Sequence, residues 1–360
     1  MYRQRSAVRL FLKTFCMSSI VFMMVGGGVW YAVGSVVRPP EVPNIAAARP
    51  GLHGHEESSF SLLSAGVEEG EEDELGGAVM PLSLAQFDER RPMFFTFLIF
   101  GLTEGLHANT IMVAAYDAEA RQGYILSIPR DSRVDFARNR RKIVSAYLVG
   151  RLNGGGHEGG VARMKHEVST LVGFKPDFYI SVDYEAFVRI VDAVGGVEVY
   201  TPFHMIYDDP FQNLHINIPA GMQLLDGKNA LRFSRYRLGN DRRKSITDYQ
   251  RIENQQQVLT AVARELLTPA AILAIPEFIS IFNEYVHTDL SAGELLWFAN
   301  QARNIGGIDA LSLYTLPMLG TSGAPGWYEM PDESGILELV NRTLNPLVRD
   351  ITSDDLRIVR

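Results

Sequence analysis

Short apolar runs that alternate with helical patterns constrain the fold of this chain more than any other feature. Runs that end in glycine, proline or a charged turn predict strands over residues 94–101, 110–117, 123–129, 176–184, 197–202 and 309–317. Apolar residues at helical spacing predict helices over residues 141–150, 161–173, 184–196, 250–267, 276–286 and 292–303. Strands that alternate with helices predict an α/β fold in which helices are layered on a sheet.

The folded part is predicted to be one domain over residues 92–360. No internal repeat and no break in composition appears after residue 92. The whole chain has 360 residues, of which 46% are hydrophobic and 21% are charged, as is ordinary for globular proteins.

Residues 14–37 carry no charged side chain. A helix of that length, rising about 1.5 Å per residue, crosses a hydrocarbon core ~30 Å thick. Basic residues precede the run, at Arg3, Arg5, Arg9 and Lys13. The positive-inside rule therefore places residues 1–13 in the cytoplasm and the remainder outside. We expect a single-pass cell-membrane protein; the alternative is a cleaved signal peptide, whose apolar core is usually shorter.

Residues 38–91 have the composition of a disordered stalk. The segment begins with a stretch rich in proline, glycine and polar residues, and an acidic run at 66–77 follows. Little apolar surface is available there to offset the entropy of ordering. The acidic run explains much of the formal net charge of -8. The charge therefore does not oppose an anionic ligand, while the overall basic balance of a nucleic-acid-binding protein is missing.

Several common kinds of site lack their sequence patterns. Cys16 is the single cysteine, so no disulfide within the chain and no cysteine-based metal site can form. The glycine-rich segment 150–160 lacks the Lys-Ser/Thr ending of a phosphate-binding P-loop, and we interpret it as a connection between helices. GTSGAP at 320–325 lacks the pattern of a nucleophile elbow, and the histidines lack zinc-ligand spacing. Arginine and aspartate residues remain as candidates.

The segment 231–257, LRFSRYRLGNDRRKSITDYQRIENQQQ, concentrates arginine. It is either a solvated helix of mixed charge or a site for a ligand with several negative charges. Guanidinium groups bind phosphate oxygens through paired hydrogen bonds, which favours the second interpretation. Asp226 is a candidate helix N-cap, with the helix running towards Arg235. We interpret Arg232, Arg242, Arg243 and Lys244 as solvated flank.

Two pairs within this segment are candidates for a site. Arg235 and Arg237 flank Tyr236, so their side chains point the same way if the backbone is extended and diverge if it is helical. Asp248 and Arg251 are an i,i+3 pair on one helix face.

A third candidate follows the predicted strand at 123–129. Arg130 and Asp131 come directly after it in SIPRDSR, at the carboxyl end of the strand. Ligands of open α/β sheets bind at that edge. The alternative is a turn with a surface ion pair.

In this order, these segments resemble the LytR-CpsA-Psr family over most of residues 95–268, and residues 268–360 fit as a structural continuation. The matching segments are NTIMVAAYD, ILSIPRDS, KIVSAY, VDYEAFVRIVDAVGGVEV, YDDP, GMQLLDGKNALRFSRYR and DYQRIENQQQ. The resemblance implies an αβα-layered domain with a central mixed sheet outside a bacterial membrane. It also implies transfer of a glycopolymer, such as a teichoic acid or a capsule polymer, from a polyprenyl pyrophosphate carrier to peptidoglycan.

The resemblance assigns roles to particular residues. The arginines that grip the pyrophosphate would be Arg130, Arg235, Arg237 and Arg251. Mg²⁺ would screen it at Asn109 and Asp248, and Asp131 or Asp241 would be the catalytic base. An apolar cavity between sheet and helices would take the lipid tail.

Three positions depart from the family pattern. Asn109 stands where the family has aspartate, Val144 where it has asparagine, and Asn254 where it has arginine. A neutral amide contributes no charge to a Mg²⁺ site. The arginines remain, so the alternative to a transferase is a catalytically weakened protein of the same fold that binds a polyprenyl phosphate. A transcriptional regulator, an older description of the family, is disfavoured by the predicted extracellular domain and the lack of a DNA-binding helix pattern.

Overall fold

The computed structural model describes residues 38–42, 89–103, 106–134, 142–268, 271–302, 305, 307–322 and 327–358. The segment 1–37, with the predicted anchor, and most of the predicted stalk lie outside the described residues, so these interpretations stay predictions. Within the described residues, no helix has the length and apolar character needed to cross a membrane. The chain separates into two compact units. One comprises Met1–Glu41 and Leu290–Asn304, with helix α8 (Ala292–Ala302); the other comprises Val42–Asp289 and Ile305–Arg360.

The larger unit is built on a mixed sheet in which six described strands lie in the order β10-β3-β2-β1-β4-β9. The strands are β1 (Phe94–Thr103), β2 (His107–Asp117), β3 (Gln122–Ser127), β4 (Phe178–Val182), β9 (Val286–Thr288) and β10 (Leu311–Thr315). β1, β2 and β3 pair antiparallel in sequence order, whereas β4 pairs parallel with β1 and β10 parallel with β3. The prediction of an α/β fold with a central mixed sheet is confirmed.

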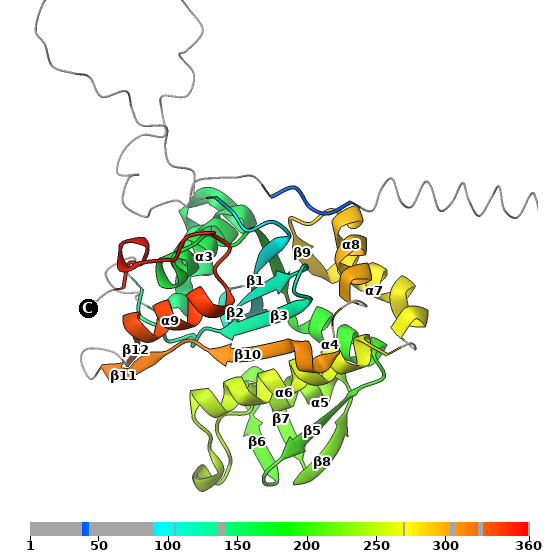
Figure 1. The fold of residues 1–360 in the computed structure, drawn as a ribbon. Helices are drawn as coiled ribbons and strands as arrows, with labels where there is room; N and C mark the ends of the chain where they lie inside the picture. Colours follow the sequence, from blue (N-terminus) through cyan, green and yellow to red (C-terminus); the bar gives the residue numbers. More distant parts are fainter. Residues whose placement is uncertain are drawn as a thin grey trace, which may run out of the picture. The chain divides into compact units, whose positions relative to one another are not determined.

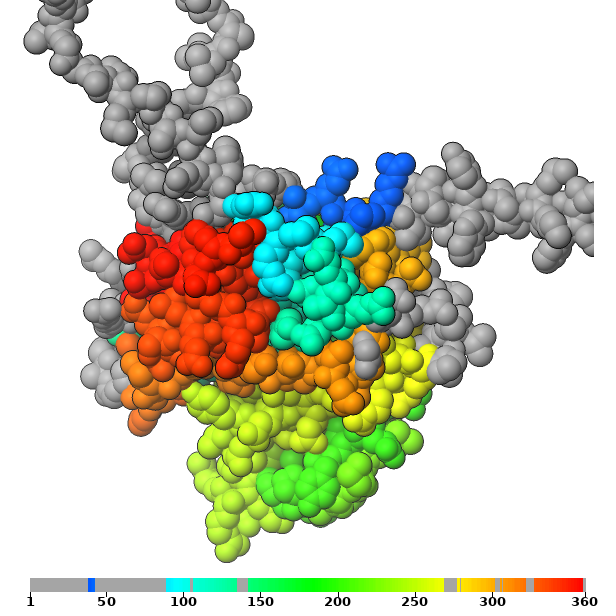
Figure 2. Space-filling model, in the orientation of Figure 1, coloured from blue at the N-terminus to red at the C-terminus, as the bar shows by residue number. Residues whose placement is uncertain are grey.

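Helices α2 (Ala146–Gly150), α3 (Gly156–Val172) and α9 (Glu333–Thr343) bury apolar side chains against β1 and β2. Leu98, Phe100, Met164, Leu171 and Val340 are fully buried in this core. α4 (Tyr184–Ala193) and α6 (Asp248–Leu266) lie on the other side of the sheet in Figure 1. The Gln256 side chain of α6 donates hydrogen bonds to Ser127 and to the carbonyl of Tyr314, and the surfaces of α6 and β10 adjoin in Figure 2.

A second core lies between α6, α5 (Gly227–Arg235) and two antiparallel ribbons (Figure 1). One ribbon pairs β5 (Val197–Thr201) with β8 (Gly221–Leu225), and the other pairs β6 (Met205–Asp209) with β7 (Leu214–Ile218). Phe233 and Tyr236 are fully buried in this core. Of these four strands, only β5 matches a predicted strand.

The described part has three further regular elements and six short helices. The regular elements are α7 (Ala271–Tyr285), β11 (Met318–Ser322) and β12 (Tyr328–Pro331), the last two forming an antiparallel hairpin. The short helices are η1 (Ile143–Ser145), η2 (Arg151–Gly155), η3 (Pro210–Gln212), η4 (Arg242–Lys244), η5 (Ile308–Ala310) and η6 (Ser353–Asp355).

The glycine-rich segment 150–160 connects helices, as predicted, but most of it is itself helical. η2 joins α2 to α3 and kinks at Asn153 and Gly154, the latter with a φ of 95°. A Cβ on Gly150 would overlap the carbonyl oxygen of Gly159. Glycine is therefore required where α2 and α3 approach most closely.

Two helix starts in the second core fix the positions of charged residues. Asp226 caps α5 by accepting a hydrogen bond from the Asn229 N–H at 2.8 Å, which confirms the predicted N-cap. α6 begins with a capping box, in which the Thr247 side chain and the Gln250 side chain bind each other's backbone N–H. These caps place Arg235 at the end of α5 and Asp248 at the start of α6.

Candidate functional site

Polar side chains from separate elements gather at one edge of the mixed sheet. β3 and β4 both run parallel to β1, so the three carboxyl ends share this edge. Thr103 ends β1, Arg130 follows β3, Tyr184 begins α4 after β4, and Asn109 lies near the start of the antiparallel strand β2. This is the edge at which α/β sheets bind ligands.

A chain of side-chain contacts links Arg130 to Arg235 along this edge. Arg130 Nη1 donates to Asn109 Oδ1 at 2.8 Å, and Asn109 Nδ2 donates to Thr103 Oγ1 at 2.6 Å. The Thr103 and Tyr184 hydroxyls are 2.8 Å apart, and the Arg235 guanidinium lies 4.8 Å from the centre of the Tyr184 ring. The sequence does not predict that Asn109 orients Arg130.

Arg251, Asp248 and Arg130 form a second group of contacts. Arg251 Nη2 lies 2.8 Å from Asp248 Oδ1, so the predicted i,i+3 pair is present, and Arg130 Nε lies 3.6 Å from the same oxygen. Burial lowers the pKa of Arg251 to about 10. The charge of Asp248 raises this pKa, and the charges of Arg130 and Arg237 lower it further. Arg251 remains charged at neutral pH and is only 6% exposed. Arg130, Arg237, Asp248 and Asp131 therefore act electrostatically on Arg251, and we call Arg130, Arg237, Asp248 and Arg251 the arginine cluster.

Asp131 lies at the rim of the arginine cluster. Its Oδ1 is 2.9 Å from Lys142 Nζ, so the corner after β3 contains an ion pair as well as the arginine. The corner is also tied to β12, because Glu329 N donates to the Asp131 carbonyl and Arg133 N donates to the Glu329 carbonyl. The contact with Lys142 is not signalled by the sequence pattern.

The structure does not bring all predicted site residues together. Asp241 pairs with Arg243, whose Nε and Nη2 each lie 3.1 Å from a carboxylate oxygen, and this hydrogen bonding lowers the pKa of Asp241. Arg235 donates to Gln212 Oε1 at 3.1 Å, and Arg237 is exposed. Asp241 therefore pairs with Arg243, which is not part of the arginine cluster.

The backbone from Arg235 to Arg237 is neither fully extended nor fully helical, so it fits neither predicted alternative completely. Arg235 is the last residue of α5, while Tyr236 leaves the helix with φ −58° and ψ 126°. The Tyr236 side chain is fully buried and its hydroxyl donates to the Lys244 carbonyl at 2.9 Å. The buried tyrosine therefore separates the two arginines. Of the expected flank, Arg242, Arg243 and Lys244 are exposed, whereas Arg232 is half-buried and donates to Asn229 Oδ1 at 2.9 Å.

Tyr249 and Glu329 form a contact beside the arginine cluster that sequence reasoning did not identify. Tyr249 follows Asp248, and its hydroxyl donates to Glu329 Oε2 at 3.2 Å. Burial, followed by the Glu329 charge and hydrogen bond, raises the pKa of Tyr249 to about 12, so this phenol is neutral and donates. No local pattern marks Glu329, because β12 is brought to the corner by tertiary pairing with Ser132.

Buried polar atoms in the arginine cluster lack hydrogen-bond partners within the described residues. They are Nε of Arg130, Nε of Arg251 and both carboxylate oxygens of Asp248, although Asp248 Oδ1 forms an ion pair with Arg251 at 2.8 Å and lies 3.6 Å from Arg130 Nε. A buried donor without a hydrogen bond is costly, so the two buried guanidinium N–H groups favour an anion as a further partner. Phosphate oxygens match guanidinium donors in charge and geometry.

The donor set does not fit the Mg²⁺ that the resemblance implies. Asn109 Oδ1 already accepts a hydrogen bond from Arg130, and Asp131 is bound by Lys142. Asp248 retains free lone pairs but lies between two guanidinium groups. Mg²⁺ requires carboxylate and phosphate oxygens in octahedral geometry, and the adjacent positive charges repel it. No group of three or more His, Cys, Asp or Glu side chains suited to a metal occurs in the described part.

Asn109→Asp is expected to create a dependence on Mg²⁺ that the natural chain lacks. The new carboxylate would neutralise part of the cluster and weaken binding of geranyl pyrophosphate about tenfold in EDTA. Mg²⁺ is expected to restore that affinity in the variant and to change the affinity of the natural chain by less than about twofold. Isothermal titration with and without Mg²⁺ measures both. A natural chain that binds only with Mg²⁺ would contradict this expectation.

The other two departures from the family pattern also lie near the arginines. Val144 donates its backbone N–H to the Arg130 carbonyl at 3.0 Å. Asn254 is 6% exposed, less than one helical turn beyond Arg251 on α6, and its Nδ2 has no hydrogen-bond partner in the described part. Neither substitution removes a guanidinium contact that the structure shows.

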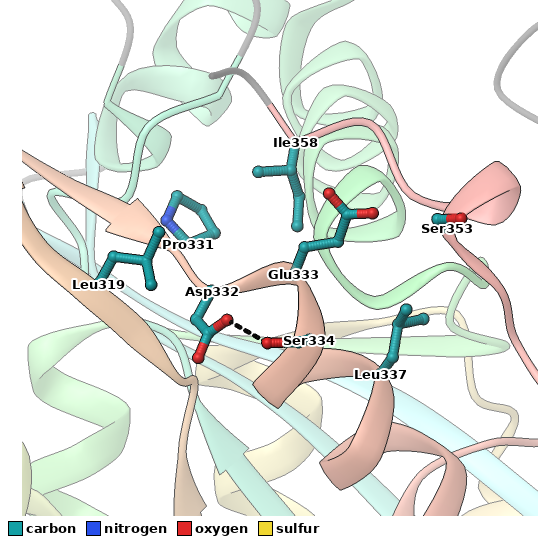
Figure 3. Close-up of a pocket in the computed structure, with 8 residues that line it drawn as sticks. All are labelled: Leu319, Pro331, Asp332, Glu333, Ser334, Leu337, Ser353 and Ile358. Carbon is teal, nitrogen blue, oxygen red and sulfur yellow. Dashed lines mark hydrogen bonds between the residues drawn. The ribbon is translucent and has the colours of Figure 1, made fainter.

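The pocket in Figure 3 contains none of the predicted site residues. It has a volume of about 470 Å³ and is lined by Leu319, Pro331, Asp332, Glu333, Ser334, Leu337, Ser353 and Ile358. These residues come from the β11–β12 hairpin, α9 and the C-terminal segment. The apolar cavity expected for a lipid tail stays a prediction.

The chain belongs to the LytR-CpsA-Psr family, because the model of the LytR_cpsA_psr family matches residues 82–343. The chain is 25% identical over 185 residues to the regulatory protein MsrR of Staphylococcus aureus, covering 51% of each protein. It is 26% identical over 245 residues to the polyisoprenyl-teichoic acid–peptidoglycan teichoic acid transferase TagV of Bacillus subtilis, covering 66% of this chain and 59% of TagV. The chain spans about half the length of the curated relatives it matches.

The fold is also that of solved structures. The crystal structure of Bacillus subtilis TagV matches with a TM-score of 0.55 and 23% identity, over 69% of this chain and 95% of that chain. At this identity the likeness establishes the fold, including the α/β architecture with its central mixed sheet.

Proposed function

We propose that this protein is a membrane-anchored phosphotransferase that moves a glycopolymer from a polyprenyl pyrophosphate carrier to peptidoglycan. The observation that carries the proposal is the pair of buried guanidinium N–H groups, on Arg130 and Arg251, that have no acceptor in the described part. Membership of the family and the activity for which TagV is named support the choice of substrate and acceptor. The predicted anchor at residues 14–37 would keep the site beside a lipid-linked carrier.

The residues of the site suit phosphoryl transfer, because they can stabilise negative charge and hold the pyrophosphate in a fixed position. Phosphoryl transfer places negative charge on the equatorial oxygens and on the leaving oxygen, and enzymes stabilise it with fixed cationic donors. Arg130 and Arg251 would donate to the pyrophosphate, while Asn109 and Asp248 hold these guanidinium groups in place. Fixed donors need no reorganisation during the reaction, which is why held arginines favour catalysis.

The alternative is a protein of this fold that binds a polyprenyl phosphate without transferring the glycan. Asn109 and Asn254, two neutral amides at charged positions of the family pattern, favour it. A single-turnover assay with a carrier-linked glycan and a peptidoglycan acceptor separates the two functions. Formation of the linked product supports the transferase, whereas binding of the carrier without product supports the alternative.

Arg130→Gln is expected to weaken binding of geranyl pyrophosphate about 10- to 100-fold, because it removes a charge-assisted hydrogen bond to the anion. Isothermal titration against the full chain measures the dissociation constant. Arg342→Gln is the matched control, because Arg342 lies on α9 with 61% of its side chain exposed. Equal affinities of the two variants would contradict the assignment of Arg130. No binding by the natural chain would refute both the transferase and the alternative.

A further inference from the structure

The carboxylates closest to the arginine cluster differ in what they already bind. Asp131 contacts Lys142, and Asp248 contacts Arg251 and Arg130. Each carboxylate would have to leave its ion pair before it could contact an acceptor hydroxyl.

Asp241 is engaged in the same way. Arg243 donates to both of its carboxylate oxygens, and its own backbone N–H adds a third contact. The hydrogen bonds that lower its pKa also make it a weaker base. Both residues that the sequence nominates as the base, Asp131 and Asp241, therefore have a cationic partner in the structure.

Glu329 has a neutral hydrogen-bond partner, as does Asp183, whose carboxylate accepts from the Ala186 N–H and is used to cap α4. Among the described residues, Tyr249 is the hydrogen-bond partner of the Glu329 side chain, through Oε2 at 3.2 Å. Two backbone hydrogen bonds to Asp131 and Arg133, at 3.0 and 2.9 Å, fix its strand against the corner that carries Arg130. Its Oε1 makes no hydrogen bond within the described residues.

Access from solvent separates Glu329 from the buried Arg251. Glu329 is partly exposed, and Tyr249 is 39% exposed, whereas Arg251 is 6% exposed. A polymer acceptor is too large to enter the interior and must present its hydroxyl from the solvent side. Glu329 is partly open to solvent and is joined through its backbone to the corner that carries Arg130.

We propose that Glu329 is the general base that activates the acceptor hydroxyl, with Tyr249 as its positioning residue. The inference rests on the proposed transferase function. The acceptor oxygen attacks the phosphorus that bears the glycan, and its proton moves to Glu329. The bond from that phosphorus to the bridging oxygen breaks, and its electron pair leaves with the carrier phosphate. The products are a glycan–acceptor phosphodiester and a polyprenyl monophosphate.

Glu329→Gln tests the proposal, because it keeps the shape of the side chain and removes its basicity. We expect transfer from a carrier-linked glycan to peptidoglycan to fall about 10²- to 10⁴-fold, with affinity for geranyl pyrophosphate unchanged. Glu329→Asp, which keeps a carboxylate, is expected to retain more transfer than Glu329→Gln. The matched control is Glu198→Gln, which removes an exposed carboxylate from β5 in the second core and is expected to leave both readouts unchanged.

Tyr249→Phe provides the second readout. Without its hydrogen bond, the Glu329 carboxylate loses a fixed orientation, and we expect transfer to fall about 3- to 10-fold with carrier affinity unchanged. The variant keeps the aromatic ring, so the fold is expected to be maintained.

The outcomes separate this inference from the proposed function. Normal transfer by a folded Glu329→Gln variant would overturn the role of Glu329 and leave the transferase function standing. Loss of carrier affinity together with transfer would also overturn it, because Glu329 would then act in binding. A natural chain that binds the carrier but produces no linked product would refute the transferase and this inference with it.

Discussion

Replacing Arg251 with alanine is expected to lower the free energy of unfolding by about 3–5 kcal/mol. The side chain is 6% exposed and lies 2.8 Å from Asp248, whose own side chain is 12% exposed. Removing the guanidinium leaves the Asp248 charge in a poorly solvated position, where Arg130 is the nearest cation at 3.6 Å. Urea denaturation of the natural chain and the variant, followed by circular dichroism, measures the difference.

The double variant Arg251→Met with Asp248→Leu separates the ion pair from packing. Apolar side chains of similar volume leave no buried charge, and such replacements are often neutral or stabilising. We therefore expect the double variant to regain most of the stability lost in Arg251→Ala, while binding of geranyl pyrophosphate stays impaired. A double variant as unstable as Arg251→Ala would show that the charges themselves hold α6 in place.

The sheet was predictable where its strands are long and continuously apolar. The run from Phe94 to Gly101 is buried on both faces of the sheet. Such a strand is apolar at nearly every position, and a short continuous apolar run of this kind is typical of a buried strand. The helix after Asp226 was predictable because a capping residue precedes it. These signals are local, so they can be recognised in the sequence without knowledge of the tertiary structure.

The ribbons and the C-terminal hairpin were not predictable for the opposite reason. β7 and β8 alternate exposed and buried residues over only five positions each, too few to exclude other structures. β12 is shorter still, and it meets the corner after β3 through a bridge between Ser132 and Glu329, which are distant in sequence. Pairing between segments that are distant in sequence depends on the tertiary structure, so no local sequence pattern predicts it.

The candidate site shows the same division. The Asp248–Arg251 contact follows from helical spacing, and the place of Arg130 follows from the end of a strand. The contact between Arg130 and Asn109 depends on the antiparallel register of β1, β2 and β3, which sequence spacing does not give. The residue pattern supplied the arginines and the resemblance assigned their roles, whereas the contact of Arg130 with Asn109 required the structure.

Replacing Tyr236 with alanine is expected to lower the free energy of unfolding by about 3–5 kcal/mol, as for other large aromatic residues in cores. Tyr236 is fully buried, packs 6.0 Å from the Phe203 ring and anchors the loop after α5 through its bond to the Lys244 carbonyl. The cavity would release the segment that carries Arg235 and Arg237. The thermal unfolding temperature and the affinity for geranyl pyrophosphate are expected to fall together.

Tyr236→Phe distinguishes packing from the hydrogen bond. The ring remains, while the carbonyl of Lys244 loses its donor, and we expect a loss of about 1 kcal/mol with carrier affinity nearly unchanged. If Tyr236→Phe weakens binding as much as Tyr236→Ala, then the loop anchored at Lys244, rather than the buried ring, determines where the two arginines lie. If neither variant alters binding, Arg235 and Arg237 do not hold the anion, and recognition rests on Arg130 and Arg251, whose guanidinium groups are fixed by Asn109 and Asp248.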